Sequence, residues 1–391
     1  MNYSINLVLL ACINKSYKNF INLLDNGNNF NFTLNSEATE FSRCFAIFGL
    51  HLIGETSKLS LRSNKLSSDI RKDLDLYKAK RQKLEFSLRQ DKPYLQLLAF
   101  SLSALSILGK LKEDPLEDHI VGLISNNIED SIEKIESLAG RPQSGNQSMF
   151  IMIILYHAHA YLDLDTLPLI QKWQKIHLDA INKFGFWGSF DSMSHLQFQN
   201  GYHQYEIFDY FQTKNVPWDS ASSFVANLAD DDGHFAPYPG GGGCYDYDAI
   251  YLLTCSSSQS INKHTKLLLK TAKSILSEQN SDGGFCESKK IRPRNLENII
   301  KAIKHVNSST GLARIERLRQ LITLLRIKHN SINTHWSVYS RGWGESDLWD
   351  SWFRMLTIAR IDIALNPTNH LNWGFINYPG IGYHSINRQN Q

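Results

Sequence analysis

Two neighbouring aspartates, Asp246 and Asp248, are well placed to do chemistry in this chain of 391 residues. They lie in the run CYDYDAIYLL, which follows four consecutive glycines at 240–243. The run predicts a helix, and carboxylates in a first turn are favoured by the positive end of the helix dipole. Burial and a nearby like charge both oppose the ionisation of a carboxylic acid. We therefore expect Asp246 or Asp248 to titrate well above a free carboxylate, with Asp248 as the catalytic general acid.

A second pair of candidates, His203 and Glu206, lies in the run NGYHQYEIFDY. Three residues separate them, so both side chains fall on one face of a helix. A histidine beside a carboxylate forms an acid–base pair or half of a metal site. The plain alternative is a histidine that packs among aromatic rings and is satisfied by Glu206. We count both residues as catalytic candidates.

Aromatic and polar residues around these acids are expected to bind the substrate. Asp347, Asp350 and Arg354 recur at helical spacing near the end of the chain, with two tryptophans between them. Aromatic rings can stabilise a carbocation by cation–π attraction. The expected substrate-binding residues are Tyr202, Tyr205, Tyr245, Tyr247, Trp349, Trp352, Asp350, Arg354 and Asn146.

The elements that position these residues recur with a period near 50. Phe186, Phe235 and Phe285 follow glycine-containing turns and lie 49 and 50 residues apart. Such a period is typical of a repeat architecture with one supersecondary unit per period, and two helices fit that length. Helices that are apolar on nearly all sides alternate with amphipathic helices, as in a ring of inner helices covered by outer ones. The sequence predicts an all-α fold, an (α/α)6-type toroid. We expect a single domain over 1–391, with an N-terminal segment at 1–36 and a basic helical insertion at 287–332.

The turn QNSDGGF at 279–285 resembles the Q-x-x-D-G-G-F turn of the prenyltransferase and terpene-cyclase repeat. This resemblance, which covers about 180–385, implies an α/α toroid whose site lies where the inner helices begin. Asp246-Tyr247-Asp248-Ala249 is similar to the D-x-D-D motif of class II terpene cyclases, with Ala249 in place of the last aspartate. In that family the middle aspartate donates a proton to an alkene or epoxide. The resemblance thus implies protonation-initiated cyclisation of a small-molecule isoprenoid, with no cofactor.

Other chemistries stay open. Zinc-assisted prenyl transfer would use Cys244, but Gly242 stands where that subfamily needs an aspartate, so we expect no metal. A glycan lyase or hydrolase acting on an oligosaccharide would suit the polar candidates, because His, Tyr and Glu can exchange protons with a sugar. A toroid that binds a ligand without catalysis is a third possibility.

The net charge and the composition limit the classes of partner that we expect this chain to bind. The net charge of +3 demands no nucleic acid partner. The segment 289–329 carries eleven Lys or Arg against two Glu, which favours a solvated outer helix pair, a peripheral membrane or partner contact, or a guide for anionic substrates. Five cysteines without a CxxC spacing favour reduced thiols and a cytoplasmic location. The start of the chain lacks a basic signal-peptide region, and no apolar run is long enough to span a bilayer.

Overall fold

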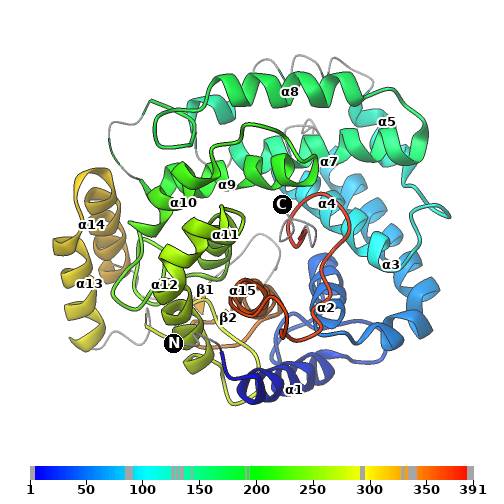
Figure 1. Ribbon diagram of the computed structural model, residues 1–391. Coiled ribbons are helices and arrows are strands. Elements are labelled where there is room, and N and C mark those ends of the chain that lie inside the picture. Colours follow the sequence, from blue (N-terminus) through cyan, green and yellow to red (C-terminus); the bar gives the residue numbers. More distant parts are fainter. Residues whose placement is uncertain are drawn as a thin grey trace.

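The regular structure of the chain is helical (Figure 1). A computed structural model describes residues 5–83, 91–124, 136–141, 144–189, 194–290, 296–326, 331–332 and 341–384, and the single positions 128, 132 and 192. Besides helices, these residues form the two-residue strands β1 (Ser331–Ile332) and β2 (Arg341–Gly342), which pair antiparallel. The prediction of an all-α fold is confirmed.

Six helices form a closed circuit in which each contacts the next and the last contacts the first. We call this circuit the inner ring (Figure 1). Its helices are buried on nearly every side. In one of them all residues from Tyr94 to Leu105 are buried, which requires cover all round. The inner-ring helices are α2 (Glu40–Leu52), α4 (Lys92–Ile107), α7 (Ser144–Leu162), α9 (His195–Tyr210), α11 (Gly243–Thr254) and α15 (Leu348–Leu365).

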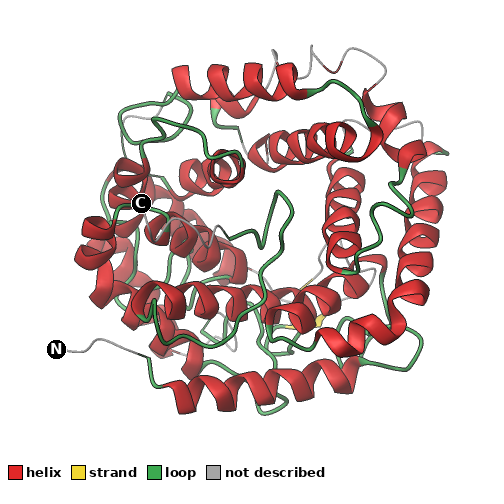
Figure 2. Cartoon of the chain, turned by 45° about the vertical axis from the view of Figure 1, so that its right-hand side comes forward, coloured by secondary structure: helices red, strands yellow, loops and turns green. Residues whose placement is uncertain are grey.

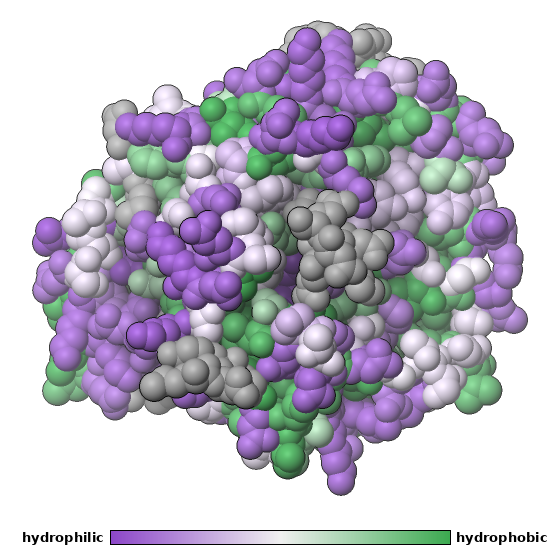
Figure 3. Space-filling view, viewed as in Figure 1, coloured by the Kyte–Doolittle hydropathy of each residue, from purple (hydrophilic) through white to green (hydrophobic). Residues whose placement is uncertain are grey.

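A second layer of helices covers the inner ring from outside (Figure 2). These helices are amphipathic: the one at 258–277 buries Leu268, Ala272 and Ile275 at helical spacing. Hydrophilic residues cover most of the face seen in Figure 3. The double layer is compatible with the predicted α/α toroid. The outer helices are α1 (Leu7–Leu24), α3 (Thr56–Gln82), α5 (Glu117–Ile124), the short 3-10 helix η1 (Glu136–Ala139), α8 (Leu167–Asp179), α10 (Trp218–Ala226) and α12 (Ser258–Ser277).

Helix α1 lies within residues 1–36, which the sequence analysis described only as an N-terminal segment. Its buried residues, among them Leu10, Ile13 and Tyr17, recur every three or four positions and pack against α2. That spacing is an amphipathic helix signal that the sequence does contain. Residues 7–24 therefore belong to the outer layer.

Three turns with the same backbone geometry carry the period near 50. They begin at Asn182, Asp230 and Asn280, where the backbone N–H donates to the carbonyl four residues later at 2.7, 2.8 and 2.9 Å. The fourth residue of each turn is a glycine with φ between +84° and +91°, a conformation that side chains disfavour. The turns connect α8 to α9, α10 to α11, and α12 to the segment before α15. The repeat is therefore a property of the backbone as well as of the sequence.

The basic segment forms two helices, α13 (Leu296–Ser308) and α14 (Gly311–Arg326), that pack on each other. We call this pair the basic hairpin. Glu316 attaches it to α9, because its carboxylate accepts hydrogen bonds from Ser194 Oγ and the backbone N–H of His195, both at 2.6 Å. The buried Arg317 donates to the carbonyl of Leu228 at 2.7 Å.

The segment 371–384 after α15 returns into the middle of the inner ring, where Figure 1 draws it in red. We call it the tail. The Tyr378 hydroxyl lies 2.8 Å from His157 Nδ1 of α7, and residues 378–383 are all buried. Arg360 of α15 donates to the carbonyl of Tyr383 at 3.2 Å. The tail thus joins α7 and α15 across the ring.

Candidate active site

Asp248 is a buried carboxylic acid in the second turn of α11, 2% exposed. Burial raises the pKa of Asp248 well above its ordinary value, and the charges of Glu206 and Asp246 raise it further. Among the described residues, none forms a hydrogen bond with its carboxyl group. These conditions favour the protonated acid, as expected from the sequence.

Glu206 of α9 is a second buried acid, and its charge interacts with that of Asp248. Burial raises the pKa of Glu206 to about 8. In the described part of the chain neither carboxyl oxygen forms a hydrogen bond of ordinary geometry, and the Tyr202 hydroxyl and the charge of Arg360 only partly offset the effect of burial. Asp248 and Glu206 can therefore lie close together on adjacent inner helices at pH 7, because both are neutral. Two carboxylates in the same positions would repel each other.

His203 lies one turn before Glu206, but no hydrogen bond joins them in the residues described. Burial lowers the pKa of His203 to about 3, with a smaller contribution from the charge of Lys92. The imidazole is therefore neutral, and protonating it where it lies is costly. His203 and Glu206 share a helix turn without forming the acid–base pair considered above.

Asp246 has a different environment from Asp248. It is fully buried, and its carboxylate accepts hydrogen bonds from His234 Nδ1 at 2.8 Å, the backbone N–H of Phe235 at 2.9 Å and Arg354 Nη1 at 2.6 Å. Burial alone would lower the pKa of His234, but the charges and hydrogen bonds of Asp246 and, to a smaller extent, Glu278 prevail and raise it to about 9. Asp246 is thus paired with two cationic side chains, whereas the raised pKa of Asp248 makes Asp248 the proton donor of the pair.

Arg354 also holds the loop of four glycines. Its Nη2 donates to the carbonyls of Gly240 at 2.9 Å and Glu287 at 2.6 Å. Within the loop, Gly241 has φ +66°, and a Cβ there would lie 2.3 Å from Asp246 Oδ2. Arg354 was expected to bind substrate, but it is buried and its guanidinium is committed to the loop and to Asp246.

A group of aromatic rings in mutual contact extends from Tyr247, next to Asp248, across the inner ring. Tyr247 lies 6.0 Å from Tyr202 and 5.4 Å from Phe353, measured between ring centroids. Phe353 in turn lies 4.4 Å from Trp349 and 4.9 Å from Trp352. The sequence-based set therefore identified four members of a larger aromatic group. It missed Phe45, Phe48, Phe100, Tyr251 and Phe353, which contact these rings from α2, α4, α11 and α15.

The remaining expected substrate-binding residues are dispersed. Tyr205 faces the outer layer, since its hydroxyl donates to the Gly185 carbonyl at 2.5 Å and its ring lies 5.0 Å from that of Trp218. Tyr245 is half-buried and packs 6.1 Å from Tyr238.

Asn146 is half-buried in the first turn of α7. Asp350 is buried in the first turn of α15, where its backbone N–H donates to the helix-capping Asp347 at 2.8 Å. A Cβ on Gly243 would lie 2.8 Å from Asp350 Oδ1, so α11 and α15 begin side by side.

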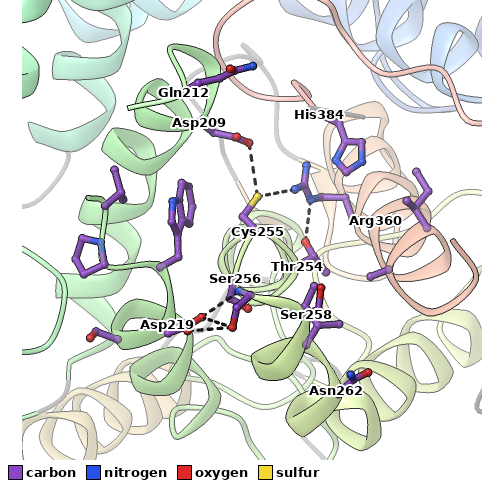
Figure 4. A pocket seen from close by; sticks show the side chains of 18 of the residues that line it. Asp209, Gln212, Asp219, Thr254, Cys255, Ser256, Ser258, Asn262, Arg360 and His384 are labelled. Carbon is purple, nitrogen blue, oxygen red and sulfur yellow. Dashed lines mark hydrogen bonds between the residues drawn. The ribbon is translucent and has the colours of Figure 1, made fainter. Parts of the chain in front are cut away.

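An open pocket of about 910 Å³ lies at the other end of α9, α11 and α15, where these helices finish (Figure 4). Its lining mixes polar and apolar side chains, and the polar ones include Asp209, Thr254, Cys255 and Arg360. None of the expected site residues lines it. The sequence pattern pointed to the starts of helices, whereas the pocket is lined by residues at or after their last turns. Of the lining residues, only Asp209 lies in a run that the pattern had identified.

Cys244 is poorly suited to bind zinc. Burial raises the pKa of its thiol well above the ordinary value, whereas zinc binds the thiolate. One other group of described residues, Asp75, Asp118 and His119, brings ligand atoms close enough for a metal ion. It lies in the outer layer, where Arg71 pairs with Asp118 at 2.5 Å. The five cysteines are free thiols.

A comparison of the chain with models of known protein families and with curated proteins finds no match. Among the helices of the described residues, none combines the length and the apolar character needed to cross a bilayer.

Proposed function

We propose that the protein is a class II-type terpene cyclase-like enzyme, in which Asp248 protonates an alkene or epoxide of an isoprenoid substrate. One observation carries the proposal: a carboxylic acid with a raised pKa lies buried beside an aromatic group on the inner ring. A carboxylic acid can donate a proton at neutral pH only if it has kept that proton, and burial keeps Asp248 protonated.

The neighbouring residues suit the later steps of such a reaction. Proton transfer leaves Asp248 as a carboxylate and creates a carbocation on the substrate. Rings such as those of Tyr202 and Tyr247 can each stabilise that cation by about 0.5–2 kcal/mol. Glu206, whose pKa is about 8, remains neutral at pH 7 and does not repel the new Asp248 carboxylate. The proposed reaction uses no cofactor, and a cytoplasmic location belongs to the same proposal.

The test is cyclisation in deuterated water. Wild-type protein is incubated with linear polyprenyl alkenes and their terminal epoxides, and the products are analysed by mass spectrometry. We expect a cyclic product that carries one deuterium from the enzyme. Asp248→Asn should reduce its formation by about two to four orders of magnitude, because the amide keeps the size and loses the acidic proton.

The matched control is Asp75→Asn, the same change on a carboxylate that is half-exposed in the outer layer. It should leave the rate unchanged. A folded Asp248→Asn protein that still cyclises the substrate would refute the role of Asp248.

The second candidate function is glycan chemistry, and the open pocket favours it. Hydrogen-bonding side chains in its lining, among them Gln212, Asn262 and Arg360, suit the hydroxyl groups of an oligosaccharide. The discriminating assay incubates the protein with a panel of oligosaccharides and measures new reducing ends and unsaturated uronic products. Turnover there, without any isoprenoid product, would favour the lyase or hydrolase. Binding of either ligand class without turnover would favour the non-catalytic toroid.

A further inference from the structure

We propose that Cys255 is a nucleophilic thiol in the open pocket and that this second site takes small polar molecules with an electrophilic carbon. The inference does not depend on the cyclase proposal, because the pocket shares no residue with that site. It rests on a cation, a carboxylate and a cavity that meet at one sulfur atom (Figure 4).

The cation is Arg360 of α15, whose Nη2 lies 3.0 Å from Cys255 Sγ. Its other nitrogens hold the guanidinium in place: Nε donates to Thr254 Oγ1 at 3.3 Å and Nη1 to the Tyr383 carbonyl at 3.2 Å. The guanidinium also lies 4.0 Å above the Tyr251 ring. Arg360 is buried and its charge is fixed beside the sulfur, and a fixed cation favours the thiolate over the thiol.

The carboxylate is Asp209 at the end of α9. Its Oδ2 lies 3.6 Å from Cys255 Sγ and also accepts a hydrogen bond from the Tyr251 hydroxyl at 2.6 Å. The Tyr251 hydrogen bond fixes this oxygen, so it can orient the thiol and accept its proton. Cys255, Asp209 and Arg360 thus supply nucleophile, proton acceptor and stabilising charge.

The cavity makes the thiol reachable. Cys255 is half-buried and lines the pocket of about 910 Å³ together with Trp218, Gln212 and Asn262. This volume suits a small-molecule ligand, and the amide and hydroxyl side chains of the lining suit a polar one. Of the other cysteines, Cys44 and Cys286 are buried, whereas Cys12 is exposed on α1. Cys12 therefore provides an internal reference for an ordinary accessible thiol.

The charged and titratable groups around the thiol come from several elements. Beyond Asp209, Tyr251 and Arg360, the pocket is lined by Lys214 after α9, Asp219 of α10 and His384 of the tail. The carboxylates oppose the thiolate and the cations favour it. Arg360 is the cation in direct contact with the sulfur, so we expect it to dominate.

The test is alkylation of the native wild-type protein by iodoacetamide. In this step Sγ attacks the methylene carbon, a C–S bond forms, and the C–I bond breaks with loss of iodide. The thiol proton passes to Asp209 and then to water. Samples are quenched over time between pH 6 and pH 9, and peptide mapping gives a separate rate for each cysteine.

We expect Cys255 to react about tenfold faster than Cys12 at pH 6.5, with a rate that levels off at lower pH than the rate of Cys12. Arg360→Met should remove this advantage, and Arg360→Lys should retain part of it because the charge remains. A rate for Cys255 equal to or below that of Cys12 throughout the pH range overturns the proposal. That comparison uses only the wild-type protein, so it holds even if an Arg360 variant fails to fold.

Discussion

Helix α15 carries two buried arginines, Arg354 and Arg360, that serve opposite ends of the inner ring. Arg354, near the start, donates to the Asp246 carboxylate and to two loop carbonyls. Arg360, two turns later, donates to a thiol, a hydroxyl and one carbonyl. In the described residues, no carboxylate forms a direct ion pair with Arg360.

The contrast shows how similar residues acquire different roles. The charge of Arg354 is neutralised by the carboxylates of Asp246 and Glu278 and fixes the glycine loop, so this arginine stabilises the fold. The charge of Arg360 is held in place by neutral groups and is left to act on the Cys255 sulfur. A buried charge is available for chemistry only where its surroundings satisfy its hydrogen bonds without neutralising it.

The largest effect should follow from removing Arg354. Arg354→Met leaves the Asp246 carboxylate buried beside a single cation, which typically costs about 3–5 kcal/mol of unfolding free energy. Arg360→Met leaves no carboxylate without its direct ion-pair partner in the described residues, so we expect a loss of about 1–3 kcal/mol. Urea unfolding monitored by circular dichroism measures both.

Lys65→Met is the reference, because Lys65 forms an exposed pair with Asp69 and should change the unfolding free energy by about 0.5 kcal/mol at most. Should Arg360→Met prove the more damaging change, the distinction between a structural and an available arginine would be wrong.

The next effect is a pH dependence of the unfolding free energy. It arises at the end of the inner ring where α11 and α15 begin, which we call the starting end. The pKa of His234 in the folded protein is raised to about 9 from an ordinary 6.5, so its stabilisation is fully present below pH 6.5 and is lost as pH rises through 9. We expect this loss to reach at most about 3 kcal/mol. His234→Gln should make the fall in unfolding free energy between pH 6.5 and pH 9 shallower, and the buried acid Glu206, with a pKa of about 8, should account for part of the slope that remains.

His203→Gln is the matched control. Its folded pKa is lowered to about 3, so neutral His203 stabilises the protein above pH 6.5 and this stabilisation is lost as pH falls toward 3. The variant should therefore keep the wild-type slope between pH 6.5 and pH 9. If His234→Gln also keeps that slope, the network around Asp246 does not hold a protonated histidine.

The smallest effect concerns the basic hairpin, which is attached to α9 at the starting end. It exposes Leu296, Ile300 and Ile303 on α13, and on α14 it exposes Ile315, Leu318, Ile322 and Leu325. Apolar residues at helical spacing flanked by Lys and Arg are typical of helices that lie on anionic lipid surfaces. We predict binding to vesicles that contain phosphatidylserine and much weaker binding to phosphatidylcholine vesicles. Binding of the basic hairpin to a membrane would bring the end of the inner ring where α9 begins close to an apolar substrate dissolved in the lipid.

Flotation with the vesicles tests this. Leu318→Asp should weaken binding by about 1 kcal/mol, because it adds a charge and removes an apolar contact. Leu61→Asp, on α3 outside the hairpin, replaces another exposed leucine and should have no effect. Equal weakening by both variants, or no binding to either vesicle, would exclude this surface as a lipid contact.

Much of the fold was predictable because its signals are local. The glycine turns need a positive φ that few other residues adopt, so they recur visibly in the sequence. The alternation of apolar and amphipathic helices likewise follows from which sides each helix buries. Helix α1 shows the same signal in Leu10, Ile13 and Tyr17, and could have been found from it.

The candidate site was predictable only in part. Asp248 and Asp246 look alike in the sequence, and their burial was expected from their place at the start of a predicted inner helix. Which of them is neutralised depends on Arg354, 108 residues after Asp246, and on the turn that carries His234. Such contacts follow from how helices far apart in the sequence pack together, and no local pattern encodes them.

The sequence by itself determined the all-helical class, the period of the turns and the type of acid at the start of α11, because backbone preference and hydrophobic periodicity act over a few residues. Only the tertiary structure decided that Tyr205 faces outward, that the tail enters the ring, and that Cys255 meets Arg360. The physical reason is that burial, charge pairing and pKa depend on the groups that a folded chain brings together in space. Two residues of one type, such as Arg354 and Arg360, therefore differ in function although the sequence presents them alike.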